Sequence, residues 1–208
     1  MSTLHAFGAS FVYGMIENEN NPPYGDVEHD RPYTRPFPII VAEHFDLKPV
    51  IRALPGRSNN VQLTDLYTEL INDKILSTDL IFYGITEPRR DPSVRYYKGQ
   101  DSSWEYVHNM AYCTTRLLLE QYSRIFDREI LIADIFKRNK EYITDKWVTY
   151  RNKNVIKEPF DEIAVPGTEL TQRFGHPNEE GHKAIAEQVI KAVYQFGLHT
   201  RFERYIYD

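Results

Sequence analysis

The order of apolar and polar positions along this chain divides it into short apolar runs and longer stretches with helical spacing. The short runs predict buried strands at residues 3–7, 49–54, 78–83 and 129–132. Helical spacing predicts helices at residues 37–45, 60–75, 178–196 and, with less regular spacing, 135–150. Strands that alternate with helices are typical of a parallel sheet wrapped by helices, so we expect a three-layer α/β/α sandwich of flavodoxin-like type.

A further helix begins at Ser102 or Ser103, where a serine hydroxyl can cap the first turn. Its apolar residues form one broad stripe, made of Trp104, Val107, Met110, Ala111, Thr114, Leu117 and Leu118. Residues 151–172 show no regular pattern. Two polar excursions, at about 17–36 and 85–101, follow predicted strands, and long loops of this kind are often functional. We expect both to flank a site within a single domain over residues 1–208.

Composition narrows the function classes. The chain of 208 residues is 41% hydrophobic and 26% charged, which fits a globular domain. Its net charge of −5 argues against a nucleic-acid-binding protein, and Arg89–Arg90 are interpreted as part of a solvated face. No signal peptide and no apolar run long enough to cross a membrane is visible, so we expect a soluble protein made in the cytoplasm. The single cysteine, Cys113, is interpreted as core packing.

The first predicted strand ends in a turn that presents a serine. After residues 3–7 come Gly8, Ala9 and Ser10, and a short helical turn follows. This geometry exposes a hydroxyl at the edge of a sheet and directs free backbone N–H groups toward whatever lies there. Taken alone, Ser10 is better explained as a helix cap than as a catalytic residue.

A histidine directly before the last predicted helix supplies a partner for this serine. His176 precedes Pro177, which fixes the chain as it enters the helix. Because ligands of such sheets bind beyond the carboxyl ends of the strands, His176 and Ser10 are expected on one edge. A neutral imidazole there can take the proton of a serine hydroxyl. His182 is about 240° further round a helix, which argues against a metal site made with His176.

Together these segments resemble the SGNH, or GDSL, hydrolase family. The family has Gly-Asp-Ser at the end of its first strand, where this chain has Gly8-Ala9-Ser10. Its second-strand glycine corresponds to Gly56, and its Gly-x-Asn-Asp block to Gly84-Ile85-Thr86-Glu87. Its last block matches His176-Pro177-Asn178 with Gly181-His182, so the resemblance extends over residues 3–190.

The resemblance implies a serine esterase that needs no metal or other cofactor and acts on a small or carbohydrate-borne ester. Ser10 is then the nucleophile and His176 the base. The backbone N–H groups of Ser10 and Gly56, with the Thr86 hydroxyl, are the expected oxyanion hole. Residues after the strand ends are the substrate-binding candidates: Arg57, Asn59, Glu87 and Arg89.

Three positions depart from the family pattern. Arg173 stands where the family has the aspartate that orients the histidine, Ala9 replaces the aspartate of the first block, and Thr86 replaces an asparagine. Loss of the acid costs about 10⁴ in turnover in a Ser-His-Asp triad. A second hypothesis is therefore an inactive SGNH-like binding or structural module, for example of a phage particle. The segment Thr86–Arg90 is similar to a Thr-x-Pro-x-Arg variant of some bacteriophage-encoded members.

Overall fold

A five-stranded parallel sheet forms the centre of the molecule. The computed structural model describes residues 1–14, 35–90, 103–137, 154–165, 167–171 and 175–202. The strands run in the order β2-β1-β3-β4-β5, and every pair of neighbours is parallel. Their bounds are β1 Thr3–Phe7, β2 Lys48–Ile51, β3 Leu80–Ile85, β4 Ile130–Asp134 and β5 Val155–Ile156. All strands therefore end at one edge of the sheet.

The central strands are buried on both faces, as strands covered by helices on each side must be. Every residue of β3 and β4 is buried. Alternate residues point to opposite sides and belong to two separate apolar clusters; Phe82 and Leu131 lie in one, and Ile81 and Ile132 in the other. The α/β/α sandwich expected from the sequence is confirmed.

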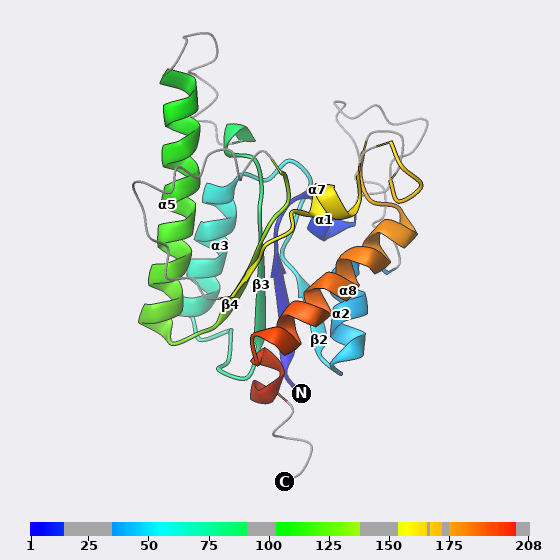
Figure 1. Cartoon of the computed structure of the whole chain (residues 1–208). Helices are drawn as coiled ribbons and strands as arrows, with labels where there is room; N and C mark the ends of the chain where they lie inside the picture. The colour runs from blue at the N-terminus through cyan, green and yellow to red at the C-terminus, as the bar shows by residue number, and fades with distance from the viewer. Residues whose placement is uncertain (15–34, 91–102, 138–153, 166, 172–174, 203–208) are drawn as a thin grey trace.

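One face of the sheet is covered by the first and last long helices. These are α2, Phe37–His44, and α8, Glu179–Gln195, which lie side by side (Figure 1). The short α1, Ser10–Tyr13, and α7, Phe160–Ile163, lie near the carboxyl ends of the strands on the same side. Phe37 packs edge-on against Phe82 and Phe160 at 5.3 Å between ring centres in each pair, which joins α2 to β3 and α7.

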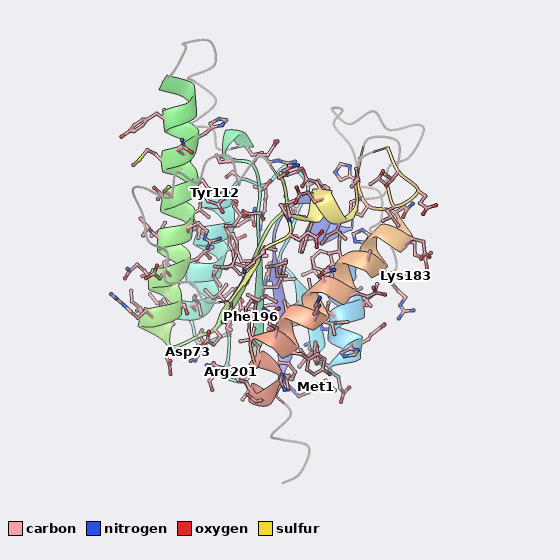
Figure 2. All side chains as sticks on the ribbon, viewed as in Figure 1. Met1, Asp73, Tyr112, Lys183, Phe196 and Arg201 are labelled. Carbon is pink, nitrogen blue, oxygen red and sulfur yellow. The ribbon has the colours of Figure 1, made fainter. Side chains whose placement is uncertain are left out.

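The other face is covered by α3, Asn59–Ile71, and α5, Ser103–Phe126. The two helices meet through Tyr67, whose ring centre lies 5.5 Å from that of Tyr122. Tyr112, labelled in Figure 2, is fully buried, and its hydroxyl donates to both carboxylate oxygens of Asp134 at 3.0 Å. The face that α5 buries is thus partly polar, and it does not coincide with the apolar stripe seen in the sequence: Met110 and Leu117 of that stripe are exposed.

Most predicted elements are confirmed within a few residues, and three expectations need correction. The strand expected to end at residue 83 continues through Gly84, because its pairing with β4 extends to Ile85. Residues 151–172 were expected to be irregular, but they contain β5 and α7. Cys113 is half-buried and does not belong to either core cluster.

Some expectations concern parts of the chain that are not described. Most of the helix predicted at 135–150 and of both excursions, 17–36 and 85–101, lies outside the described residues, and residues 135–137 form a turn instead of a helix. Of the second excursion, the described part includes the 3₁₀ helix η1, Pro88–Arg90. A second 3₁₀ helix, η2, Leu198–Arg201, follows α8. Within the described residues, no helix has the length and apolar character required to cross a membrane.

Candidate active site

Ser10 begins α1 directly beyond the end of β1. The strand ends at Phe7, and Gly8 allows the chain to turn under the helix: a Cβ atom at Gly8 would lie 2.1 Å from Cγ2 of Val12. Only a residue without a side chain fits this approach. Ala9 occupies the N-cap position and makes no side-chain hydrogen bond, so Ser10 is the first helical residue and not the cap that the sequence alone favoured. Ser10 is 3% exposed, so its hydroxyl is recessed in the surface.

The structure brings His176 to this serine across 166 residues of sequence. Nε2 of His176 lies 2.9 Å from Oγ of Ser10, within hydrogen-bond distance. With the proton of the neutral ring on Nδ1, Nε2 accepts the hydrogen bond from the serine hydroxyl. The separation also falls in the range required of a base and the nucleophile that it deprotonates.

The segment that carries His176 is held by its flanking residues. Gly175 has a left-handed backbone, with φ of 84°, which turns the chain immediately before the histidine. Asn178 caps α8 by accepting from the Gly181 N–H at 3.0 Å, and its own N–H donates to the Leu170 carbonyl at 3.0 Å. A Cβ atom at Gly181 would lie 2.1 Å from that carbonyl oxygen. The residues that resemble the family's last block therefore fix the position of the imidazole.

The two backbone N–H groups expected to hold an oxyanion belong to two different elements. The first N–H groups of α1 have no partner inside the helix, as at every helix start. Gly56 lies in an exposed turn beyond β2, the strand next to β1, with a left-handed φ of 76° and open space around its Cα. Thr86, the third predicted member, is completely buried just after β3, and its hydroxyl has no hydrogen-bond partner among the described residues.

Asn59 has a different role from the substrate contact that the sequence indicated. Its side-chain amide donates to the Thr86 carbonyl and accepts from the Thr86 N–H, both at 2.9 Å. Its own carbonyl accepts from the Tyr83 hydroxyl at 3.0 Å. Since Asn59 is buried and both ends of its amide are engaged by Thr86, it joins the start of α3 to the end of β3 and positions Thr86.

The other substrate-binding candidates lie in different surroundings. The Arg57 guanidinium donates to the Arg52 carbonyl at 3.1 Å and pairs with Asp65, so part of its hydrogen-bonding capacity is already used. Glu87 is buried, with 8% of its surface exposed. The side chain of Arg89 lies outside the described part of the chain.

Arg173 also lies outside the described residues, and the upstream carboxylates have contacts of their own. Asp161 accepts from the Lys137 N–H at 2.7 Å, and burial raises the pKa of its carboxyl group. Glu162 pairs with the Lys137 ammonium at 3.1 Å. Asp134 points to the α5 side of the sheet, whereas Ser10 starts a helix on the α8 side, so Asp134 is not placed to orient His176.

A second histidine lies behind the first. His182 is buried in α8, its ring is stacked on Phe37, and its Nδ1 accepts from the Phe37 N–H at 3.4 Å. Burial, together with the charge of nearby His176, lowers the pKa of His182 to about 4. His182 is therefore neutral at pH 7 and places no positive charge beside His176.

Aromatic side chains that sequence patterns did not indicate form a wall beside Ser10 and His176. Phe11 packs on His176 at 5.6 Å between ring centres and on Phe136 at 5.5 Å, and the Arg90 guanidinium lies over Phe136 at 5.7 Å. Arg90 is thus half-buried against an aromatic ring, in contrast to the solvated face expected for Arg89–Arg90. Phe136 follows β4, far from both motifs in sequence, and only the fold places it here.

Within the described residues, no group of three or more histidine, cysteine, aspartate or glutamate side chains is arranged to hold a metal ion. No family sequence model and no curated protein sequence matches the chain.

Solved structures of GDSL hydrolases do match the fold. The psychrotrophic esterase EstA of Pseudoalteromonas superimposes with a TM-score of 0.59 at 9% identity, over 94% of this chain and 98% of its own. A GDSL lipolytic protein of Veillonella parvula gives 0.55 at 16% identity, over 92% and 97%. The lipase/acylhydrolase of Enterococcus faecalis gives 0.55 at 15%, over 93% and 95%. The chain is similar to these proteins along nearly its whole length, so the SGNH-type fold expected from the motifs is confirmed.

Proposed function

We propose that this chain is a serine ester hydrolase in which Ser10 is the nucleophile and His176 the general base. The observation that carries the proposal is the 2.9 Å contact between Ser10 Oγ and His176 Nε2 at the carboxyl edge of a parallel sheet. A serine at the start of a helix, a histidine within hydrogen-bond reach and free backbone N–H groups nearby are the parts that acyl transfer requires.

The reaction proceeds in two steps. Ser10 Oγ forms a bond to the carbonyl carbon of the ester while its proton passes to Nε2 of His176, and the carbonyl electrons move onto the oxygen. The N–H groups of Ser10 and Gly56, and the hydroxyl of Thr86, stabilise this oxyanion. His176 then gives the proton to the departing alcohol, which leaves an acyl group on Ser10. A water molecule, deprotonated by His176, releases the acid in the same manner.

Turnover should be slow by the standard of a complete triad. Arg173 stands where the family has the aspartate that orients the histidine. Packing against Phe11 restricts the ring of His176, but a ring contact does not stabilise the imidazolium as a carboxylate does. We expect a rate lower by up to about 10⁴ than that of a triad enzyme, and still above the uncatalysed reaction because the oxyanion donors remain.

The substrate is proposed to be a small or carbohydrate-borne ester, such as an O-acetyl group. The site offers Phe11 and Phe136 as an aromatic wall and a recessed serine, which fits a short acyl group better than a long one. The similar Pseudoalteromonas esterase was also solved in a form inhibited by monoethylphosphonate. A phosphonate is therefore a suitable probe for the nucleophile of this chain.

The test combines covalent labelling with turnover. The wild type, Ser10→Ala and a control, Ser123→Ala on α5, are incubated with a fluorescent fluorophosphonate and, separately, with p-nitrophenyl acetate. The wild type and the control should be labelled once per chain and hydrolyse the ester. Ser10→Ala should lose the label and at least about 10³-fold in kcat/KM. Wild-type protein that neither labels nor turns over would overturn the proposal in favour of an inactive binding module, and labelling that persists in Ser10→Ala would overturn the assignment of the nucleophile.

A further inference from the structure

The outer face of α5 is apolar where a solvent-facing helix normally carries charge. Tyr106 is 66% exposed, Met110 49% and Leu117 39%, and Cys113 between them is half-buried. We call these four residues the α5 seam. The same turns bury polar side chains on their inner face: His108, Tyr112, Thr115 and Arg116. The helix thus turns apolar groups outward and polar groups inward, which is the reverse of the arrangement expected for a helix that faces only water.

The fold leaves this face open. The ring contacts between α3 and α5 come late in both helices, where Tyr67 packs on Tyr122 and Phe126. Figure 1 shows the first turns of α5 extending past the start of α3. Tyr106, Met110 and Leu117 are all exposed, so α3 does not cover these positions of the seam.

The spacing of the seam is the same in both directions. Its residues follow each other at intervals of four, three and four, which is the a/d spacing of a helix-helix interface. Reversal of the helix therefore places Tyr106 opposite the partner's Leu117 and Met110 opposite the partner's Cys113. A twofold dimer needs a surface that is complementary to itself in this way. We propose that α5 pairs with α5 of a second copy of this chain, antiparallel, through the α5 seam.

The distribution of charged residues on α5 is compatible with the same antiparallel pairing. The exposed positions of α5 from 106 to 117 carry no charge, although the chain as a whole has a net charge of −5. The next residue along the seam, Glu120, falls opposite position 103, where the partner's α5 begins. A carboxylate at the start of a helix is stabilised, because the helix dipole is positive there. Glu120 therefore meets a complementary partial charge.

The exposed area of the seam indicates a weak dimer. Taking about 200–250 Å² for each fully exposed residue, Tyr106, Met110 and Leu117 leave roughly 350 Å² open per copy. A standard interface buries about 800 Å² per partner, so the seam by itself supports a weak, reversible dimer. We expect dissociation in the micromolar range, where both species are measurable.

Sedimentation velocity between about 1 and 100 µM tests the interface. The wild type should shift from monomer to dimer, and Met110→Glu, which places a charge in the seam, should remain a monomer. Ile125→Glu is the matched control, because Ile125 is 67% exposed on the same helix but lies outside the seam; this variant should still dimerise. Thermal unfolding of each variant confirms that it is folded.

The single cysteine gives an independent readout of the geometry. In the proposed pairing, the two Cys113 Cα atoms are offset by three residues along the helices and lie about 10 Å apart. A short bismaleimide should join two wild-type chains, and it should join neither Cys113→Ser nor Met110→Glu chains. A monomer throughout the concentration range, a dimer that survives Met110→Glu, or equal dissociation by Ile125→Glu would overturn the proposal.

Discussion

Acidification should destabilise this protein through His182, and the size of the effect follows from the structure. The imidazole is buried against Phe37 and accepts the Phe37 N–H through Nδ1. Protonation would place a charge in the core, next to His176, and would remove the acceptor. His182→Gln is the informative change, because the glutamine side-chain oxygen can accept the same N–H while the side chain does not titrate.

Proton linkage gives the sign and the size of the change in unfolding free energy with pH. The pKa of His182 is about 4 in the folded protein and 6.5 for an unperturbed histidine. Because the folded pKa is the lower one, the unfolded chain binds more protons below pH 6.5. The contribution of neutral His182 to the unfolding free energy is thus fully present above about pH 6.5, and it is lost as the pH falls toward 4. Between pH 7.5 and 4 this amounts to about 3 kcal/mol of unfolding free energy.

Asp79 also makes the stability depend on pH, but only below about pH 4. Burial raises the pKa of Asp79, but hydrogen bonds from His5 and from the N–H groups of Leu76 and Thr3 lower it more, and the net value lies below 3.8. The stability that depends on ionised Asp79 is therefore retained above about pH 4 and lost below it. Measurements that stop at pH 4 report on His182 without this contribution.

The assay is equilibrium urea unfolding, followed by circular dichroism and by tryptophan fluorescence at several pH values from 7.5 to 4. The loss of unfolding free energy over this interval should be about 3 kcal/mol smaller in His182→Gln than in the wild type. His44→Gln, which removes an exposed imidazole from α2, is the control and should keep the wild-type pH dependence. Equal pH dependence in His182→Gln and the wild type would refute the argument that burial keeps this ring neutral.

Two further changes test how the site is held. Gly8→Ala places a methyl group 2.1 Å from Val12 Cγ2, which must displace α1 and with it Ser10, so kcat/KM should fall about 10²-fold. The control is Gly167→Ala, where φ is 85° but the space around the new methyl group is open, and kcat/KM should stay unchanged. Equal losses of kcat/KM in the two variants would contradict the displacement of Ser10. Thr86→Val removes a buried hydroxyl that has no hydrogen-bond partner among the described residues. The unfolding free energy should rise by about 1 kcal/mol, while kcat should fall about 10²-fold at constant KM. An unchanged kcat would exclude Thr86 from the oxyanion hole.

The elements and the meeting of Ser10 with His176 followed from local patterns in the sequence. Short apolar runs, the glycine turn at residue 8 and the Pro177-Asn178 helix start are properties of neighbouring residues, and parallel strands must end at one edge. These patterns therefore predicted the sheet and the shared edge from residues 166 positions apart. The catalytic roles of the two side chains remain predictions until the labelling experiment is done.

Tertiary packing decided what each side chain faces. Asn59 follows a strand end like a substrate-binding residue, but the backbone of Thr86 engages its amide. Gly84 continues β3 because β4 pairs with it. The periodicity of α5 shows an apolar stripe but does not say which side meets the sheet, and the buried side is the polar one with Tyr112 bound to Asp134. Local spacing determines that a helix forms; which of its faces is buried depends on partners that are distant in sequence.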